Sequence, residues 1–291
     1  MISVIIPLYN KEVIVKRSIE SVLSQDYEDF EVIVVNDGST DKSAEIVRKI
    51  KDSRVRLIEQ TNSGPSAARN TGIKNAKGDW LYFIDADDEI EQGTLLHFHK
   101  LIQKFLEADM FLGEIYINDG KKKWLHCKYK DGFVKNIFKA HALGLTTQCS
   151  GSTIYRKEIC LEYPYNEQIH RYEDLDCLFR KYRKSSLYLT SRPVACINTN
   201  HSAASKGKNN ISEDFVGHLN FKNKSFWERI SLYKLFIEER ELYLGQIREL
   251  YPCLFYRYDY FLFYKLLGWL KSYKPLWKCY LRISGFSQFI N

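Results

Sequence analysis

Acidic side chains two residues apart follow a strongly apolar run in the first third of the chain. The segment Asp85-Ala86-Asp87-Asp88 comes directly after residues 80–84, whose unbroken apolar character predicts a strand covered on both faces. Carboxylates in this position can hold Mg²⁺ or Mn²⁺ and leave coordination positions for phosphate oxygens. An acidic triplet in a loop is more often a solvated turn, so the preceding strand is what favours a metal site.

Two further polar segments end predicted strands. Tyr9 and Asn10 follow the apolar residues 3–7, and a polar segment at 36–41 follows the β-branched run 31–35. Because the carboxyl ends of parallel strands meet at one edge of a sheet, we expect all three segments to line one crevice. The glycine-rich phosphate cradles of P-loop and dinucleotide-binding proteins are absent from the sequence. A metal ion would therefore have to neutralise a bound diphosphate.

Strands that alternate with helices are needed to position these segments. The apolar residues Val15, Ile19 and Val22 recur at helical spacing, and Pro65 suits the first position of a helix that ends before Gly78. This alternation predicts an α/β fold with a mostly parallel sheet flanked by helices. Later segments predict a hairpin (110–117 and 124–129), a helix (173–184), two strands (187–190 and 194–198) and helical stretches (213–243 and 251–272).

Composition narrows the class of protein. The 291 residues are 45% hydrophobic and 27% charged, which is typical of a soluble globular protein. The 7 cysteines contain no C-x-x-C pair, and neither a signal peptide nor a membrane-spanning apolar run is present, so we expect a cytoplasmic protein. A net charge of +7 is too small to indicate nucleic acid as a partner.

Five segments together resemble family-2 glycosyltransferases with the GT-A fold. In chain order they are SVIIPLYN (3–10), VVNDGSTD (34–41), NSGPSAARNTG (62–72), DADD (85–88) and ED (173–174). No single segment is specific for this family, but the five segments in this order are. The resemblance covers roughly residues 1–200 and carries no information about the remainder.

The resemblance implies a role for each segment on the donor side. Pro7, Tyr9 and Asp37 correspond to the nucleobase pocket, where a carboxylate can accept a hydrogen bond from uracil, and Asn10 is counted with the nucleotide-binding residues. Asp37 could instead serve an Asx-turn or a helix cap, with Asp41 the better capping candidate. Arg69 lies on the nucleotide-side helix, where it either meets the diphosphate or holds an acidic neighbour.

The metal and catalytic residues follow from the same resemblance. Asp87 corresponds to a direct metal ligand, Asp85 to a carboxylate that reaches ribose or metal-bound water, and Asp88 is a further candidate. His201 could contact metal or phosphate from the last loop, although a loop histidine is more commonly solvated. In the acidic pair Glu173-Asp174, Asp174 corresponds to the general base. A pair of acids at a helix N-terminus is also favoured by the helix dipole alone.

These expectations define a metal-dependent inverting glycosyltransferase. A hexose or N-acetylhexosamine would move from a UDP-sugar to an acceptor glycan hydroxyl, with Mn²⁺ or Mg²⁺ as cofactor and a β-glycosidic product. The acceptor would sit on a lipid carrier or a surface protein, as in bacterial surface polysaccharide or glycoprotein assembly. A nucleotidyltransferase and a non-catalytic nucleotide-sugar binding module are the alternatives.

The C-terminal part differs in composition from the rest. We expect a catalytic domain at 1–205, with a nucleotide-sugar half (1–100) and an acceptor half (101–205), followed by a helical, aromatic and basic region at 206–291. In the last forty residues, aromatic side chains alternate with Lys271, Lys274, Lys278 and Arg282. Such a surface suits either peripheral contact with the inner face of an anionic membrane or packing in a dimer.

Overall fold

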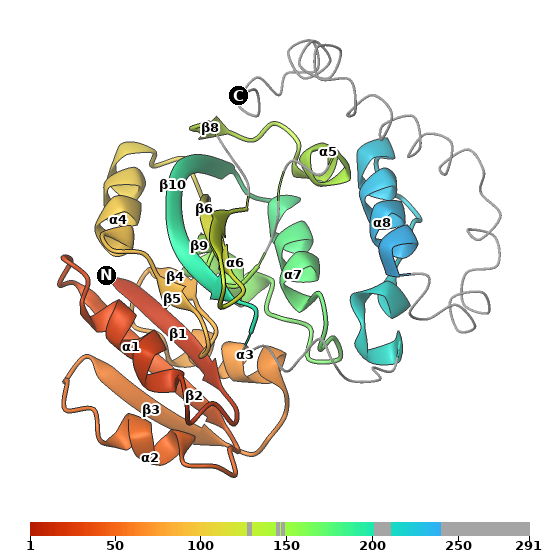
Figure 1. The fold of residues 1–291 in the computed structure, drawn as a ribbon. Coiled ribbons are helices and arrows are strands. Elements are labelled where there is room, and N and C mark those ends of the chain that lie inside the picture. Colours follow the sequence, from red (N-terminus) through yellow and green to blue (C-terminus); the bar gives the residue numbers. More distant parts are fainter. Residues whose placement is uncertain (127–129, 144–145, 147–148, 201–210, 240–291) are drawn as a thin grey trace. The chain divides into compact units, whose positions relative to one another are not determined.

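The computed structural model describes residues 1–126, 130–143, 146, 149–200 and 211–239 (Figure 1). Contacts between Cα atoms divide the chain into two units. The first contains Met1–Phe133 and Gln148–Gly207, and the second contains Val134–Thr147 and Lys208–Asn291. The three segments that sequence analysis placed at one crevice, and the acidic pair of residues 173 and 174, all belong to the first unit.

Four parallel strands form the N-terminal part of the sheet in the first unit. They are β1 (Ile2–Leu8), β2 (Phe30–Asp37), β3 (Val55–Gln60) and β4 (Trp80–Phe83), arranged in the order β3-β2-β1-β4. Three of them, β1, β2 and β4, were predicted from their apolar runs. Since β1 has β2 on one side and β4 on the other, the order reverses at β1, and the loops after these strands lie next to one another.

The remaining strands make the sheet mixed. Within the described residues the sheet has ten strands, and beyond β4 these are, in spatial order, β9 (Thr153–Arg156), β6 (Met110–Asn118), β10 (Leu187–Asn198) and β5 (Glu89–Ile90), with β7 (Lys123–Leu125) paired to β6 and β8 (Gly132–Phe133) to β10. The predicted hairpin is β6–β7, with a shorter second strand. The two strands predicted at 187–198 are one strand, whose register shifts around Pro193 because proline has no N–H for the ladder.

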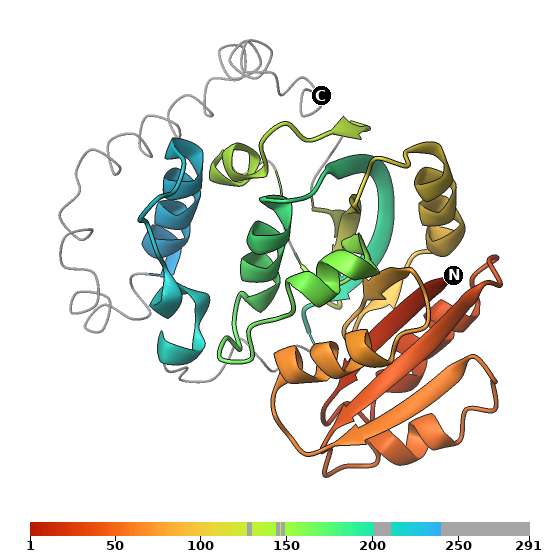
Figure 2. The ribbon, with the colours of Figure 1, turned by 180° about the vertical axis from the view of Figure 1, so that it is seen from behind.

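Helices cover both faces of the sheet. The helices α1 (Val15–Leu23), α2 (Ser43–Arg48) and α4 (Thr94–Lys104) contribute apolar residues to one buried core on the first face (Figure 1). On the opposite face lies α3 (Pro65–Asn75), which packs against β1 and β2, and α6 (Lys157–Glu162), which packs against β4 and β9 (Figure 2). A sheet covered on both faces explains why its central strands are apolar without alternation.

A glycine permits the close contact between α3 and β1. A Cβ atom at Gly72 would lie 2.4 Å from Ile5 Cγ2, well inside van der Waals contact. We therefore expect Gly72→Ala to lower the free energy of unfolding by about 1–3 kcal/mol, the usual cost of overpacking a core. Urea denaturation of the two proteins measures this loss. Lys74→Ala, at an exposed position of the same helix, is the control, and equal midpoints for Gly72→Ala and the control would contradict the argument.

The second unit is helical in its described part. It contains α5 (Ile137–Ala142) and α8 (Phe226–Glu239), which pack against each other, and the 3₁₀ helices η1 (Ile211–Glu213) and η2 (Phe215–His218). The helix predicted from residue 213 thus begins only at Phe226, because the preceding residues form short 3₁₀ turns. The helix predicted at 251–272 and the aromatic and basic residues around it lie outside the described residues. Among the described helices, none combines the length and apolar character needed to cross a bilayer.

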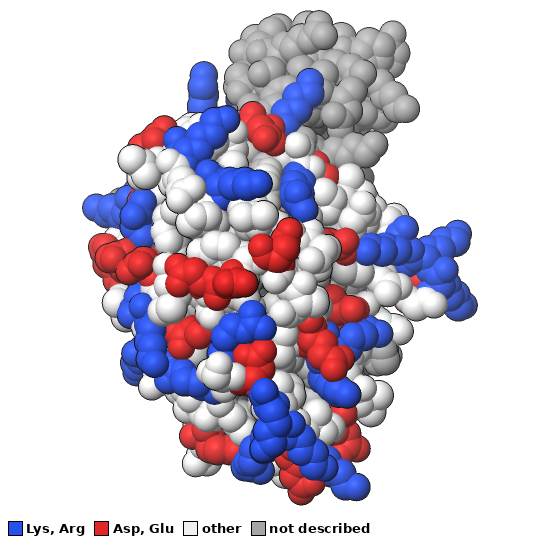
Figure 3. Space-filling model, turned by 90° about the vertical axis from the view of Figure 1, so that its left-hand side faces the viewer, with Lys and Arg blue, Asp and Glu red and all other residues white. Residues whose placement is uncertain are grey.

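Charged side chains of both signs cover the face drawn in Figure 3. Lysines and arginines are interspersed with aspartates and glutamates there, which is the pattern of a solvated surface.

Candidate functional site

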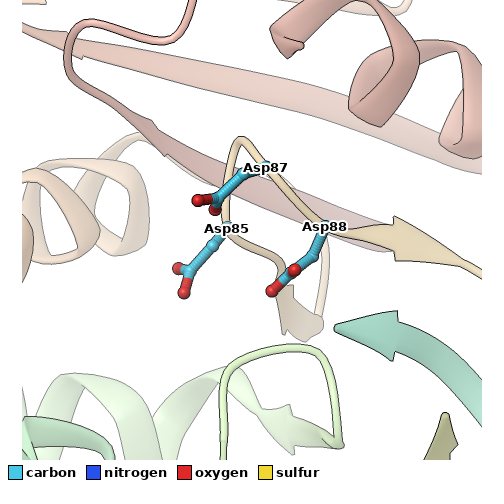
Figure 4. Close-up of side chains that lie close together, drawn as sticks. All are labelled: Asp85, Asp87 and Asp88. Atoms are coloured by element: carbon cyan, nitrogen blue, oxygen red, sulfur yellow. The ribbon is translucent and has the colours of Figure 1, made fainter. Parts of the chain in front are cut away.

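Three carboxylates gather in the loop that follows β4. Ligand oxygens of Asp85, Asp87 and Asp88 all lie within 4.8 Å of one another (Figure 4). Asp87 and Asp88 are buried, whereas the Asp85 side chain is 36% exposed. Burial, followed by repulsion from the neighbouring carboxylates, raises the pKa of both Asp87 and Asp88. A cation at this position would relieve that repulsion, and an all-oxygen donor set suits Mg²⁺ or Mn²⁺.

Two residues that sequence analysis did not select hold this acidic loop. Lys11 Nζ lies 2.5 Å from Asp87 Oδ2 and neutralises part of its charge. The backbone N–H of Asn198, at the end of β10, donates to Asp88 Oδ1 at 2.7 Å, and its side-chain amide donates to the Asp87 carbonyl at 2.9 Å. Lys11 could have been found from sequence, because it directly follows the polar segment Tyr9-Asn10, which was predicted to lie beside the acidic loop. Nothing in the sequence pointed to Asn198.

Arg69 connects the acidic loop to the acidic pair. Its guanidinium is buried and places Nη2 2.9 Å from Asp85 Oδ1 and Nη1 2.8 Å from Glu173 Oε1. The guanidinium carbon also lies 5.2 Å from the centroid of the Tyr165 ring. Of the two roles considered for Arg69, the structure shows the one in which it holds acidic neighbours. It thereby links the loop after β4 to α7 (Glu173–Tyr182).

The acidic pair Glu173-Asp174 lies in the first turn of α7, next to the Arg69 guanidinium. Burial raises the pKa of Glu173 to about 7, with the Asp174 charge adding to the effect and Arg69 opposing it. Burial also raises the pKa of Asp174, and Asp85 adds to that rise. Arg69, the Tyr165 hydroxyl and the Ser150 N–H stabilise the ionised form of Asp174 and work in the opposite direction. Burial thus disfavours the charged form of both acids, and Arg69 favours it.

Polar residues of α3 fix the loop that precedes α7. Asn70 exchanges two hydrogen bonds with the backbone of Tyr165, each 2.9 Å long. The Ser66 hydroxyl donates to the carbonyl of Ile169 at 2.9 Å. The segment 62–72, from which sequence analysis selected only Arg69, therefore also positions Tyr165 beside Asp174.

Besides Arg69 and Asp85, the predicted nucleotide-binding residues lie at the carboxyl ends of β1 and β2 or in the loop directly after β1. Asp37 is buried and accepts hydrogen bonds from the Gln60 amide at 2.7 Å and from the backbone of Ser63 and Gly64 at 2.9 Å each. These bonds hold the loop before α3. Gly64 adopts φ +90°, a conformation that favours glycine.

The loop after β1 is joined to the loop after β2. Asn10 adopts φ 51° and its side-chain oxygen accepts from the Thr40 N–H at 2.8 Å. Pro7 lies within β1 opposite Val35, and Tyr9 is 47% exposed. The carboxylate of Asp41 accepts a hydrogen bond from the N–H of Ser43, the first residue of α2, although the residue at the N-cap position itself is Lys42. His201 lies outside the described residues.

The sheet is covered on both faces, its strand order reverses at β1, and a cluster of carboxylates lies in the loop after the neighbouring strand β4. Open α/β folds bind their ligands at such a reversal, so these features define a protein of the open α/β class with a candidate ligand site. Residues 3–163 match the sequence profile of Glycosyl transferase family 2. Because the match covers more than half of the chain, the protein belongs to this family.

Relatives and solved structures agree with this family. An uncharacterized glycosyltransferase of Haemophilus influenzae is 29% identical over 276 residues, which is 91% of this chain and 98% of the relative. Glycosyltransferase GlyA of Streptococcus pneumoniae is 44% identical over 117 residues, 40% of this chain but only 17% of GlyA. The crystal structure of S. aureus TarS 1-349 in complex with UDP-GlcNAc has a TM-score of 0.67 at 22% identity, covering 82% of this chain and 72% of TarS 1-349. At that identity the structural likeness shows the fold.

Proposed function

We propose that the protein is a metal-dependent inverting glycosyltransferase that transfers a hexose or N-acetylhexosamine from a UDP-sugar to an acceptor hydroxyl. The observation that carries the proposal is the continuous chain of contacts from the Asp85 carboxylate through Arg69 to Glu173, next to Asp174. It supports a function in which a cation held by the acidic loop and a base on α7 act on the same substrate. The likeness to TarS structures that contain UDP or UDP-GlcNAc supports the choice of donor.

The donor would bind at the loops after β1, β2 and β4. Asp85, Asp87 and Asp88 would hold Mn²⁺ or Mg²⁺, which when bound neutralises the departing diphosphate. Asp37 already accepts three hydrogen bonds, but a carboxylate has about four acceptor positions, so one remains for the N3–H of uracil. Exposed Tyr9 directly follows β1, the strand paired with β2, and would cover the base.

Asp174 would act on the acceptor hydroxyl. It removes the proton as the hydroxyl oxygen attacks the anomeric carbon, while Tyr165 and Ser150 hold its carboxylate. Arg69 stabilises negative charge on the Glu173-Asp174 pair. Glu173, with a pKa of about 7, can hold a proton while Asp174 is ionised. A single base acting on the acceptor, without a protein nucleophile, implies one displacement and therefore inversion from an α-linked donor to a β-linked product.

A donor panel tests this function. The full chain is incubated with UDP-linked hexoses and N-acetylhexosamines, with Mn²⁺ or with a chelator, and free UDP is measured. We expect one donor to give slow, metal-dependent UDP release that an acceptor glycan accelerates. Release of pyrophosphate would instead indicate a nucleotidyltransferase, and donor binding without turnover would indicate a binding module. An α-linked product in the NMR spectrum would contradict inversion.

The acceptor would be a glycan on a lipid carrier or on a surface protein. A lipid-linked acceptor fits the aromatic and basic composition of residues 251–282, through which the chain would contact an anionic membrane. This part of the proposal rests on sequence alone.

A further inference from the structure

A lysine is completely buried in α7, the helix that begins with the acidic pair. Lys181 has no exposed surface, and its Nζ lies 2.8 Å from Cys177 Sγ, one turn earlier in the helix. That separation falls in the range of about 2.7–3.2 Å that is usual for N–H···O bonds, although sulfur is a larger atom than oxygen. The amine and the thiol are therefore in unusually close contact.

The surroundings of Lys181 contain thiols and aromatic rings. Among the described residues, its charge interacts with Cys177, with Cys160 of α6 and with Arg180, and with no carboxylate. The Nζ atom lies 4.4 Å from the ring centroid of Tyr155 and 5.0 Å from that of Tyr165. A buried ammonium without a carboxylate partner is costly, so the electron-rich rings and the thiols must stabilise it. This arrangement serves no step of the proposed transfer reaction.

We propose that Cys177 and Lys181 form a redox modification site, at which hydrogen peroxide joins Sγ to Nζ through one bridging oxygen. The first peroxide oxidises the Cys177 thiol to a sulfenic acid and leaves as water. The sulfenic oxygen then bonds to Nζ as a second peroxide takes one proton from oxygen, one from nitrogen and two electrons, and leaves as two waters. The lysine reacts as the neutral amine, so its ammonium first gives one proton to solvent. In total, one thiol, one ammonium and two peroxides give one S–O–N link, three waters and one proton.

Geometry favours this link over other oxidation products. The gap of 2.8 Å between Sγ and Nζ is one that a single oxygen can span with little movement, whereas a direct S–N bond would require the two atoms to approach much further. Both groups leave the same helix four residues apart, so they stay neighbours even when the loops around α7 move. The neighbouring Cys160 thiol is the competing partner, through a disulfide.

The site lies next to the proposed base. The Tyr165 ring is 5.0 Å from Lys181 Nζ and 5.2 Å from the Arg69 guanidinium, and its hydroxyl is bound to Asp174. A link across the C-terminal half of α7 would therefore act on the helix that begins with Glu173 and Asp174. The modification itself does not depend on the proposed function.

Peptide mass spectrometry of the full chain tests the link directly. The protein is treated with increasing hydrogen peroxide, its remaining thiols are blocked, and it is digested with trypsin. We expect peptide 172–180 to appear joined to peptide 181–183, because a bridged Lys181 resists cleavage, with a mass that has gained one oxygen and lost two hydrogens. Dithiothreitol in denaturant should return both peptides to their unmodified masses.

Variants separate the link from general oxidation. Cys177→Ala and Lys181→Met should each abolish the joined peptide, whereas Cys160→Ala should retain it. Lys184→Met, at an exposed position of the same region, is the matched control and should behave as wild type. The proposal is overturned if the wild-type chain gives no joined peptide at any peroxide concentration. It is equally overturned by a Cys160–Cys177 disulfide or a direct S–N link, in which two hydrogens are lost and no oxygen is gained.

Discussion

Asp174→Asn is expected to lower kcat for sugar transfer by about 10²–10⁴-fold, the usual contribution of a positioned general base. An amide has nearly the shape of the carboxylate and can still accept from the Tyr165 hydroxyl and the Ser150 N–H, but it cannot take the acceptor's proton. Affinity for UDP should stay near the wild-type value, because the nucleotide-binding residues belong to other loops. Steady-state kinetics with the best donor, together with calorimetric titration of UDP, give both quantities.

Asp176→Asn provides the matched control for that experiment. Asp176 lies in the same first turns of α7, but its carboxylate is paired with Arg180 at 2.8 Å rather than directed into the acidic pocket. We expect the Asp176 variant to keep kcat within a few-fold of wild type. If Asp174→Asn transfers sugar at a rate similar to this control, Asp174 is not the base.

The strands β1, β2 and β4, whose ends carry the proposed donor site, could be predicted from sequence because their patterns lie within short segments of the chain. Each of these strands contains an unbroken apolar run, and each run is followed at once by the polar residues it positions, such as Asp37 at the end of β2 and Asp85 after β4. Chain order alone then places these loops together, since parallel strands with helical crossovers end at the same edge.

Contacts between distant segments could not be predicted in the same way. Asn70 reaches Tyr165 across 95 residues and Asn198 reaches Asp88 across 110, and neither asparagine stands in a pattern that marks it as a partner. The order of β9, β6, β10 and β5 likewise depends on antiparallel pairings that no short-range signal specifies. These long-range contacts decide which carboxylates are buried, and burial is what raises the pKa of Glu173 and Asp174.

Asp87→Ala is expected to remove the whole increase in UDP affinity that Mn²⁺ confers on the wild-type protein. Asp87 supplies a buried oxygen of the acidic cluster, and no glycine-rich cradle is present to bind the diphosphate in its place. The variant also removes the Asp87 carboxylate beside Lys11, and the positive charge of Lys11 can attract a diphosphate weakly without any metal. Residual UDP binding by the variant should therefore be weak and insensitive to Mn²⁺, which calorimetry with Mn²⁺ and with a chelator can show.

Asp79→Ala distinguishes loss of the metal site from a general loss of negative charge. Asp79 precedes β4 whereas the acidic cluster follows it, so Asp79 lies at the opposite end of that strand, and its side chain is 81% exposed. Asp79→Ala changes the net charge by the same amount as Asp87→Ala but leaves the cluster intact, so the effect of Mn²⁺ on its UDP affinity should match that of the wild type.

Lys11 gives the metal assignment a second test, because it already neutralises Asp87 in the absence of a cation. If chelator-treated wild-type protein binds UDP as tightly and transfers sugar as fast as it does with Mn²⁺, then Lys11 is the counter-charge that the reaction uses, and the carboxylates only position it.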